Sequence, residues 1–234
     1  MNTPKTAPTY GARRWLLRET FGNLFLIALL FGIVGRWNWL MGWALSGIYI
    51  VWSLACGLFI LPRNPAMLAE RARPHPDRRK WDMRLLGAMG GLMLVEYVLA
   101  SLDARFGWTP PLPLGVQLAG LAAAILGYDS LLVWAMVTNA FFVATMRIQR
   151  ERGQTVISSG PYRLVRHPGY LGTILLHLGV PFMLNSLWAL IPGVLSAAVL
   201  IIRTALEDRA LHAELPGYID YAARTRYRLF PGVW

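Results

Sequence analysis

The sequence has a single cysteine, few acidic residues and a low total share of charged residues. Its one cysteine, Cys56, lies in an apolar segment and cannot form an internal disulfide or a cysteine-based metal cluster. Asp and Glu number 12, and charged residues make up 15% of the 234, against about 25% in soluble domains. With 56% hydrophobic residues, this composition excludes intrinsic disorder and argues against a soluble protein.

Common ligand motifs are missing as well. The sequence has no Gly-x-Gly-x-x-Gly turn after a strand and no Walker loop, so it does not predict a nucleotide-binding fold of either type. No spacing of His and Cys residues is typical of zinc, and we predict no metal site.

Long apolar runs predict an all-α, polytopic membrane protein. A helix that spans a bilayer needs about 20 mostly apolar residues. Such segments predict six transmembrane helices, at about residues 21–35, 39–61, 83–102, 114–137, 169–184 and 188–206. The last stretch, 207–234, is polar and aromatic, so we expect a cytoplasmic amphipathic segment there.

The basic residues indicate how these helices are oriented. The 23 Lys and Arg residues give a net charge of +11. If the N-terminus is cytoplasmic, six spans leave only Arg36 and Arg105 on the outer side, as the positive-inside rule requires. We therefore expect both termini in the cytoplasm, contact with membrane lipids and no nucleic acid partner. Arginine greatly outnumbers lysine, which is typical of GC-rich bacteria and favours a bacterial inner membrane.

One polar segment concentrates residues suited to binding, from Gly160-Pro161-Tyr162 to His167-Pro168-Gly169-Tyr170. Pro168 biases His167 away from the helical conformation and suits the first position of a helix, so the fifth span should begin there. The start of that helix would offer free N–H groups and a positive dipole end to a carboxylate or phosphate. The less favoured alternative is a loop that merely lies at headgroup level.

A second group lies at the end of the sixth span. Arg203 and Glu207 are four residues apart and would share a helical face, either in a binding site or only as an interfacial ion pair. Downstream, Tyr218 and Tyr221 would line one side of a short helix, which could also serve as a membrane-surface anchor.

Ionisable side chains inside the spans need a partner or a cavity. Three residues are of this kind: Glu96, Asp129 and His177. A polar path and a helix-packing network are equally open interpretations of them.

The order and spacing of these elements resemble the isoprenylcysteine carboxyl methyltransferase family and its phospholipid methyltransferase relatives. The matching residues are Gly160-Pro161-Tyr162, Arg166 to Gly172, Arg203, Glu207-Asp208, Tyr218, Tyr221 and Arg228-Leu229-Phe230-Pro231. The resemblance divides the chain into about four N-terminal spans (1–137) and a catalytic region with two spans and cofactor-binding loops (138–234).

The resemblance implies an integral membrane enzyme that transfers a methyl group from S-adenosylmethionine to a lipid-like or lipidated substrate, and we expect the acceptor to be a carboxylate, as in isoprenylcysteine carboxyl O-methylation. It implies catalytic roles for Arg203, on the substrate side, and for Glu207. The implied cofactor contacts are Gln149, Gln154, Tyr162, His167, Pro168, Gly169, Tyr170, Glu207, Tyr218 and Arg228. Gln154 stands where eukaryotic members have a His, and Glu207-Asp208 replaces the Glu-Glu pair of many members.

The chemistry leaves the acceptor open. A carboxylate that attacks a sulfonium needs no proton removed, whereas an amine needs a base such as Glu207 or His167. The sequence shows no dedicated base, which favours a carboxylate over a phospholipid amine. An NADPH-dependent, sterol-reductase-like enzyme and a non-enzymatic membrane protein remain as alternatives, and no obligate protein partner is inferred.

Overall fold

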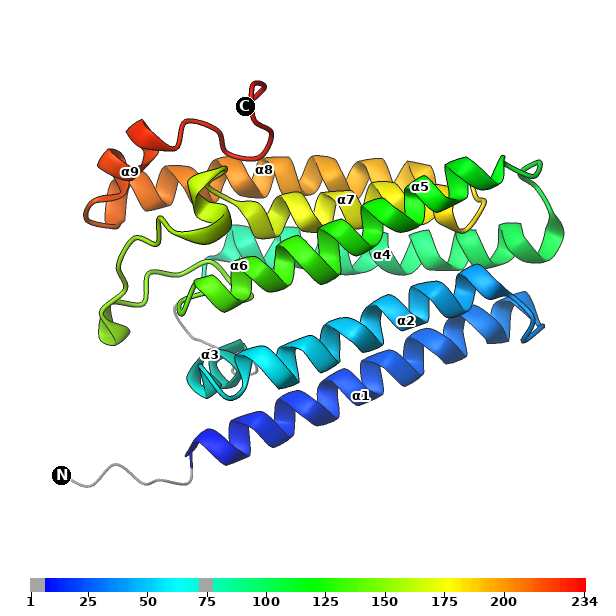
Figure 1. The fold of residues 1–234 in the computed structure, drawn as a ribbon, viewed down its shortest axis with the longest axis horizontal. Helices are drawn as coiled ribbons and strands as arrows, with labels where there is room; N and C mark the ends of the chain where they lie inside the picture. Colours follow the sequence, from blue (N-terminus) through cyan, green and yellow to red (C-terminus); the bar gives the residue numbers. More distant parts are fainter. Residues whose placement is uncertain (1–6, 72–77) are drawn as a thin grey trace.

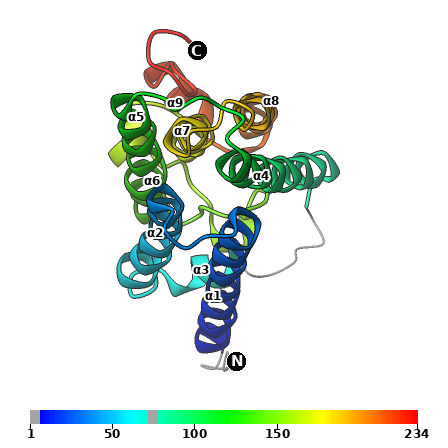
Figure 2. The same cartoon turned by 90° about the vertical axis from the view of Figure 1, so that its right-hand side faces the viewer.

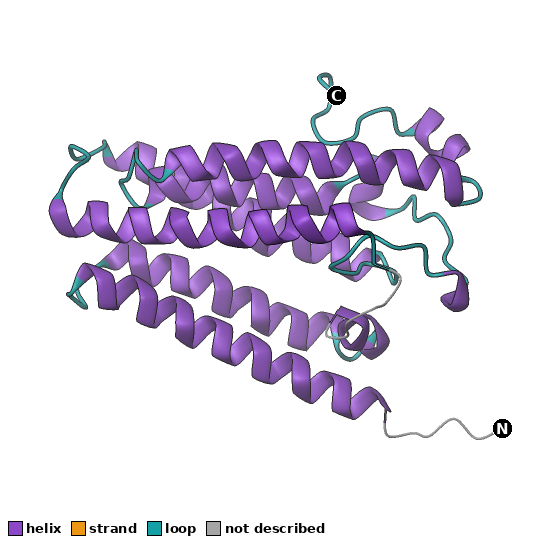
Figure 3. Cartoon of the chain, turned by 180° about the vertical axis from the view of Figure 1, so that it is seen from behind, coloured by secondary structure: helices purple, strands orange, loops and turns teal. Residues whose placement is uncertain are grey.

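The computed structural model describes residues 7–71 and 78–234, and these form helices joined by loops, with no strand in either range (Figure 3). The centre of the polar segment expected between the second and third spans lies outside the described residues. The helices are α1 (Ala7–Val34), α2 (Leu40–Ala55), η1 (Cys56–Ile60), α3 (Pro65–Arg71), α4 (Lys80–Phe106), α5 (Leu114–Ala124), η2 (Ile125–Leu132), α6 (Val133–Thr138), η3 (Arg150–Arg152), η4 (Gly160–Arg163), α7 (Pro168–Met183), α8 (Leu190–Glu214) and α9 (Tyr218–Arg224).

The long helices lie lengthwise beside one another (Figures 1 and 2). Helices α5, η2 and α6 form one rod, in which η2 is a π-helical stretch. This rod packs along α7, and α7 packs in turn against α8. The start of α1, helices α3 and α9, and the long loop before α7 gather at one end of the bundle, at the left of Figure 1. The segments expected to be cytoplasmic therefore meet at a single end.

Five helical segments are long and apolar enough to cross a membrane: Arg13–Val34, Leu40–Ile60, Lys80–Phe106, Leu114–Thr138 and Leu190–Glu214. The first begins earlier than expected, because α1 continues through Arg13, Arg14 and Arg18 rather than starting after them. The remaining expected span, 169–184, coincides with α7, which has 16 residues and is shorter than the usual crossing of about 20. A six-span topology stays a prediction.

Large apolar side chains cover the outer surface of the bundle. They are exposed along the length of the long helices, as with Phe21, Leu58, Leu94, Leu126 and Ile202. A soluble monomer rarely shows apolar surface on this scale, so the multi-pass membrane assignment follows from the fold as well as from composition.

Glycines allow α7 to lie unusually close to the rod of α5, η2 and α6. A Cβ placed on Gly172 would be 2.4 Å from the carbonyl oxygen of Gly127, and one on Gly179 would be 2.5 Å from that of Gly120. Small residues at such positions let helix backbones approach, which is the usual basis of helix association in membranes. The position of α7, and with it the loop that precedes it, depends on these contacts.

We expect Gly172→Ala to lower the stability of the protein, because the added methyl group has to push two backbones apart. Overpacking of this kind costs about 1–3 kcal/mol. Gly91→Ala on the exposed face of α4 is the matched control, since its Cβ meets nothing within 4 Å. Thermal unfolding in detergent should show a lower midpoint for Gly172→Ala alone. An unchanged midpoint would mean that the close approach is not needed.

Two of the three ionisable residues within the spans form a pair. The carboxylate of Glu96 on α4 lies 2.6 Å from Nδ1 of His177 on α7, and both side chains are buried. This contact links α4 to α7 and favours the helix-packing interpretation for these two residues. Asp129 lies on η2, with one carboxylate oxygen buried and without a hydrogen-bond donor among the described residues.

Candidate functional site

The segment from Gly160 to Tyr170 leads the chain from the polar loop into α7. Pro161 lies in the short 3-10 turn η4, and His167 comes just before Pro168, the first residue of α7. The backbone of His167 has φ −126° and ψ 61°, outside the helical region, as expected for a residue before proline. The helix start predicted from the His-Pro pair is confirmed.

The C-terminal tail is hydrogen-bonded to this segment. The N–H of Arg166 donates to the carbonyl oxygen of Tyr227, and the N–H of His167 donates to that of Arg228, both at 2.9 Å. The guanidinium of Arg166 donates to two further carbonyl oxygens at the start of the tail. The tail therefore covers the start of α7.

The carboxylate of Asp208 on α8 joins the parts of the site. It is 1% exposed and accepts two hydrogen bonds from Arg166, at 2.9 and 3.1 Å. It also accepts one from Nε of Arg228, at 2.8 Å, and one from the hydroxyl of Tyr218, at 2.9 Å. Nε2 of His167 is 3.3 Å away. Because a buried carboxylate is costly unless it is paired, these contacts hold the loop, α9 and the tail against α8.

Arg203 and Glu207 lie one turn apart on α8 but have different partners. Arg203 forms a buried ion pair with Asp82 at the start of α4, with Nε 2.7 Å from the carboxylate, and donates to the carbonyl oxygen of Ala144 at 2.8 Å. Glu207 accepts a hydrogen bond from the hydroxyl of Tyr170. The guanidinium carbon of Arg203 lies 5.0 Å from the centre of the Tyr170 ring. Arg203 and Glu207 therefore bond different partners, Asp82 and Tyr170, and the structure does not show the simple ion pair between them that was the alternative.

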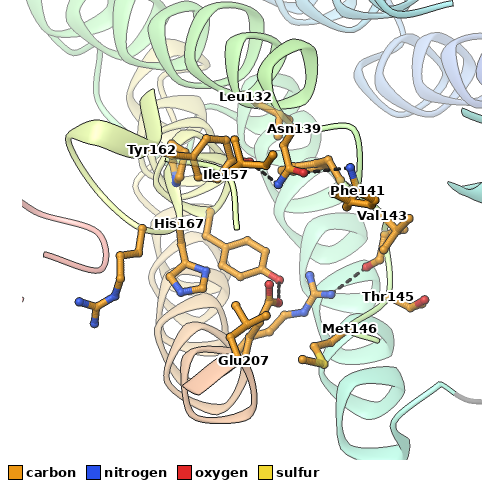
Figure 4. A pocket seen from close by; sticks show the side chains of 18 of the residues that line it. Leu132, Asn139, Phe141, Val143, Thr145, Met146, Ile157, Tyr162, His167 and Glu207 are labelled. Carbon is orange, nitrogen blue, oxygen red and sulfur yellow. Dashed lines mark hydrogen bonds between the residues drawn. The ribbon is translucent and has the colours of Figure 1, made fainter. Parts of the chain in front are cut away.

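A cavity of about 390 Å³ opens among these side chains, within the usual range of small-molecule sites, roughly 300–1,000 Å³. Figure 4 shows His167 and Glu207 on one side of it and Phe141, Val143 and Met146 on the other. Side chains from the N-terminal helices complete its wall: Trp52, Arg71, Leu86, Met89, Tyr128 and Leu132. The cavity is therefore lined by residues from both of the regions expected from the sequence, 1–137 and 138–234. The division of the chain into these two regions stays a prediction.

Most of the residues predicted for the site line this cavity. These are Gln154, Tyr162, His167, Pro168, Gly169, Tyr170, Arg203, Glu207 and Tyr218. Gln149 and Arg228 lie behind its wall instead. The side-chain amide of Gln149 donates to the carbonyl oxygen of Phe141 at 2.7 Å and so shapes the loop, while Arg228 bonds Asp208 and stacks on Trp234.

Two tyrosines in the cavity wall are held in their neutral form. Burial raises the pKa of Tyr162 and of Tyr218, and for Tyr218 the neighbouring carboxylate of Asp208 raises the pKa further. Both hydroxyls therefore stay protonated at physiological pH and donate hydrogen bonds rather than carry charge.

Sequence reasoning missed three contributors to the site. Asp82 accepts hydrogen bonds from Arg203 and from the N–H of Met146. In the sequence it stands out only as an acidic residue in the first turn of a helix, which does not indicate a binding site. The loop from Phe141 to Arg147 supplies much of one wall but carries no motif. Arg71, at the end of α3, reaches the cavity from a part of the chain outside the recognised signature.

Comparison with known proteins gives two matches. Residues 120–213 match the isoprenylcysteine carboxyl methyltransferase (ICMT) family. The cobalt-zinc-cadmium resistance protein CzcN of Cupriavidus metallidurans is 33% identical over 141 residues, which are 57% of this chain and 58% of that protein. Among the described residues, no group of three or more His, Cys, Asp and Glu side chains is arranged to hold a metal ion. The matched stretch includes the start of α7 and the C-terminal half of α8, so the part of the chain that builds much of the site is similar to the ICMT family.

Proposed function

We propose that this protein is a membrane methyltransferase that uses S-adenosylmethionine to methylate a lipophilic acceptor. The observation that carries the proposal is the convergence on one cavity of Glu207, Tyr170, His167 and the start of α7, closed by the contacts of Asp208. These are the residues to which the family resemblance assigns cofactor contacts.

The side chains present fit the functional groups of S-adenosylmethionine. Glu207 can accept hydrogen bonds from an ammonium or from ribose hydroxyls, and Gln154 adds a polar group on the loop. The faces of Tyr162 and Tyr170 suit an adenine ring or a sulfonium, the latter through a cation–π contact. The N-terminus of α7, at Pro168 and Gly169, suits a carboxylate.

When bound, S-adenosylmethionine would supply an electrophilic methyl group on a positively charged sulfur. The protein's part is then mainly to hold two reactants in line, which accounts for much of the rate of such displacements. Arg203 is placed for the acceptor. Its Nε and one terminal nitrogen are bound to Asp82 and Ala144, while within the described residues Nη1 has no partner.

A carboxylate acceptor suits this arrangement better than an amine. A carboxylate loses no proton on methylation, whereas an amine needs a base within reach. Glu207 accepts from the hydroxyl of Tyr170 and the His167 ring contacts Asp208, so both side chains already have partners, and a carboxylate acceptor needs neither of them as a base. We infer O-methylation of a lipid-like or lipidated carboxylate, as in the reaction that gives the family its name.

The position of the site fits a membrane-bound acceptor. The cavity lies at the end of the bundle where the polar segments gather, so a soluble cofactor would enter from the aqueous side and an acceptor from the bilayer (Figure 1). We place this end in the cytoplasm, with both termini, and the protein in a bacterial inner membrane.

A transfer assay tests the proposal. Purified protein is incubated with methyl-labelled S-adenosylmethionine and either a prenyl thioether carboxylic acid or phosphatidylethanolamine, and label in the organic extract is counted. We expect label with the acid that is released as methanol by base, because esters are base-labile and N-methyl groups are not. Base-stable label with the phospholipid alone would make the enzyme an N-methyltransferase. No label with either, together with binding of NADPH, would contradict the proposal and favour a reductase.

A further inference from the structure

Side chains from the N-terminal helices form part of the cavity wall. Arg71 of α3, Trp52 of α2 and Tyr128 of η2 lie there, with the rings of Trp52 and Tyr128 5.4 Å apart. The guanidinium of Arg71 lies over the ring of Phe142, 5.5 Å from its centre. A Cβ on Gly169 would be 2.7 Å from Cζ of the same ring, so Phe142 lies close to both Arg71 and the start of α7.

The arginines that line the cavity differ in how their charge is balanced. Arg166 is paired with Asp208, Arg203 with Asp82, and Arg147 with both Glu70 and Glu151. No ion pair of the Arg71 guanidinium is seen within residues 7–71 and 78–234. Its Nε is buried without a hydrogen-bond acceptor among them. A partly buried cation without a counter-charge is unfavourable, which makes this position a favourable one for an anionic ligand.

Trp52, in the same cavity wall, also has an unsatisfied donor. In the described part of the chain, the indole Nε1–H of Trp52 is buried and has no acceptor. Arg71 and Trp52 lie on different helices that line one cavity, and each carries a donor that lacks an oxygen acceptor. Leu132 and the ring of Tyr128, which pack with Trp52, provide apolar surface there.

The charged groups around Arg71 do not supply that acceptor. Glu19 on α1 is bound by its neighbour Arg18, with the closest contact 2.8 Å. Arg18 also donates to the backbone carbonyl oxygen of Arg71, which brings a second positive charge close by. Burial first, and then Arg18, lower the pKa of the Arg71 guanidinium, so both act against its charged form. An anion would relieve both effects.

We propose that Arg71, beside Trp52 in the cavity wall, forms an anion-binding subsite that takes the acidic group of a lipophilic ligand, with its apolar part against Tyr128 and Leu132. In the context of the proposed function, on which this assignment of the ligand rests, the ligand is the methyl acceptor, and Arg71 and Arg203, which line the same cavity, both attract its acidic group. The shared chemistry is a carboxylate or phosphate oxygen attached to an apolar chain.

Binding of a charged and an uncharged form of one ligand tests the subsite. The full chain in detergent is titrated with a farnesyl thioether carboxylic acid and with its methyl ester, and a lysophospholipid tests phosphate as the anion. Arg71→Met keeps a long side chain against Phe142 and removes the charge. Arg63→Met is the matched control, because Arg63 is exposed on the preceding turn and, among the described residues, its guanidinium donates to the carbonyl oxygen of Phe59 alone.

We expect wild type and Arg63→Met to bind the acid about tenfold or more tightly than the ester, and Arg71→Met to lose this preference through weaker binding of the acid alone. Trp52→Phe should also lower the affinity for the acid, but by a smaller factor than Arg71→Met. A preference for the lysophospholipid that depends on Arg71 would support the subsite and assign it to phosphate. Equal binding of acid and ester by wild type, or an acid preference that survives in Arg71→Met, would overturn the proposal.

A second readout separates binding from folding and from the proposed function. Because Arg71→Met removes an unbalanced, partly buried charge, the melting temperature of this variant without ligand should not fall below that of wild type. A fall in melting temperature together with equal weakening of acid and ester would mean a structural role and would overturn the subsite. Titration with S-adenosylhomocysteine is made in parallel. If wild type does not bind it, the methyltransferase proposal fails, whereas the subsite is still judged by the ratio of acid to ester affinity.

Discussion

Asp208→Asn is expected to cost this protein more stability than any other single change considered. The substitution keeps the shape of the side chain but removes the charge that balances Arg166, whose side chain is 7% exposed. Removing one partner of a buried ion pair typically costs about 3–5 kcal/mol, because the other charge stays buried. Asp208 also accepts bonds from Arg228 and Tyr218, so several contacts weaken together.

Two measurements check this expectation. The thermal midpoint in detergent should fall by roughly 10 °C, as a loss of this size implies for a chain of about 230 residues. Limited trypsin digestion should also cut faster in the tail, because Arg226 and Arg228 lose the contacts that hold them to α8 and the loop. Asp220→Asn is the control, since that acidic side chain is exposed on α9. A midpoint within a degree or two of wild type would refute the central role given to Asp208.

Glu207→Gln is expected to abolish most of the affinity for the cofactor without unfolding the protein. Gln keeps an oxygen that can accept from the hydroxyl of Tyr170, so the local contact survives. The lost charge weakens bonds from an ammonium or from ribose hydroxyls, and bonds to charged groups are worth about 1.5–3 kcal/mol each. Two such bonds correspond to a loss of about 100-fold or more in affinity.

Titration with S-adenosylhomocysteine, alongside thermal unfolding, measures this effect. Glu214→Gln is the matched control, because Glu214 is on the same helix, pairs with Arg79 and does not line the cavity. We expect weak binding only in Glu207→Gln, with both midpoints close to wild type. Full affinity in a well-folded Glu207→Gln would remove Glu207 from the site.

Local rules account for the parts of the structure that the sequence predicted. The pair His167-Pro168 predicts where α7 begins, because proline restricts the residue before it and fits the first helical turn. Apolar runs likewise predict the long helices. The helix that holds the first span begins before the apolar run, at Ala7, and includes Arg13, Arg14 and Arg18. Arginine side chains can extend from a helix end toward the headgroups.

Long-range pairs could not be predicted in this way. Asp82 and Arg203 are 121 positions apart, and the pairing depends on how α4 and α8 lie side by side in the folded bundle. The spacing of Arg203 and Glu207 shows that they share a face of α8, but it does not show that Asp82 and Tyr170 are their partners. Arg71 was missed for the same reason, since nothing near it in the sequence resembles a binding motif.

The most direct test of the account is calorimetric titration of the purified wild-type protein with S-adenosylhomocysteine and, separately, with NADPH. If the cavity binds S-adenosylmethionine, we expect saturable binding of S-adenosylhomocysteine at a single site per chain and no binding of NADPH. Binding of NADPH alone by folded protein would contradict it and would assign the cavity around Glu207 and His167 to a nicotinamide cofactor instead.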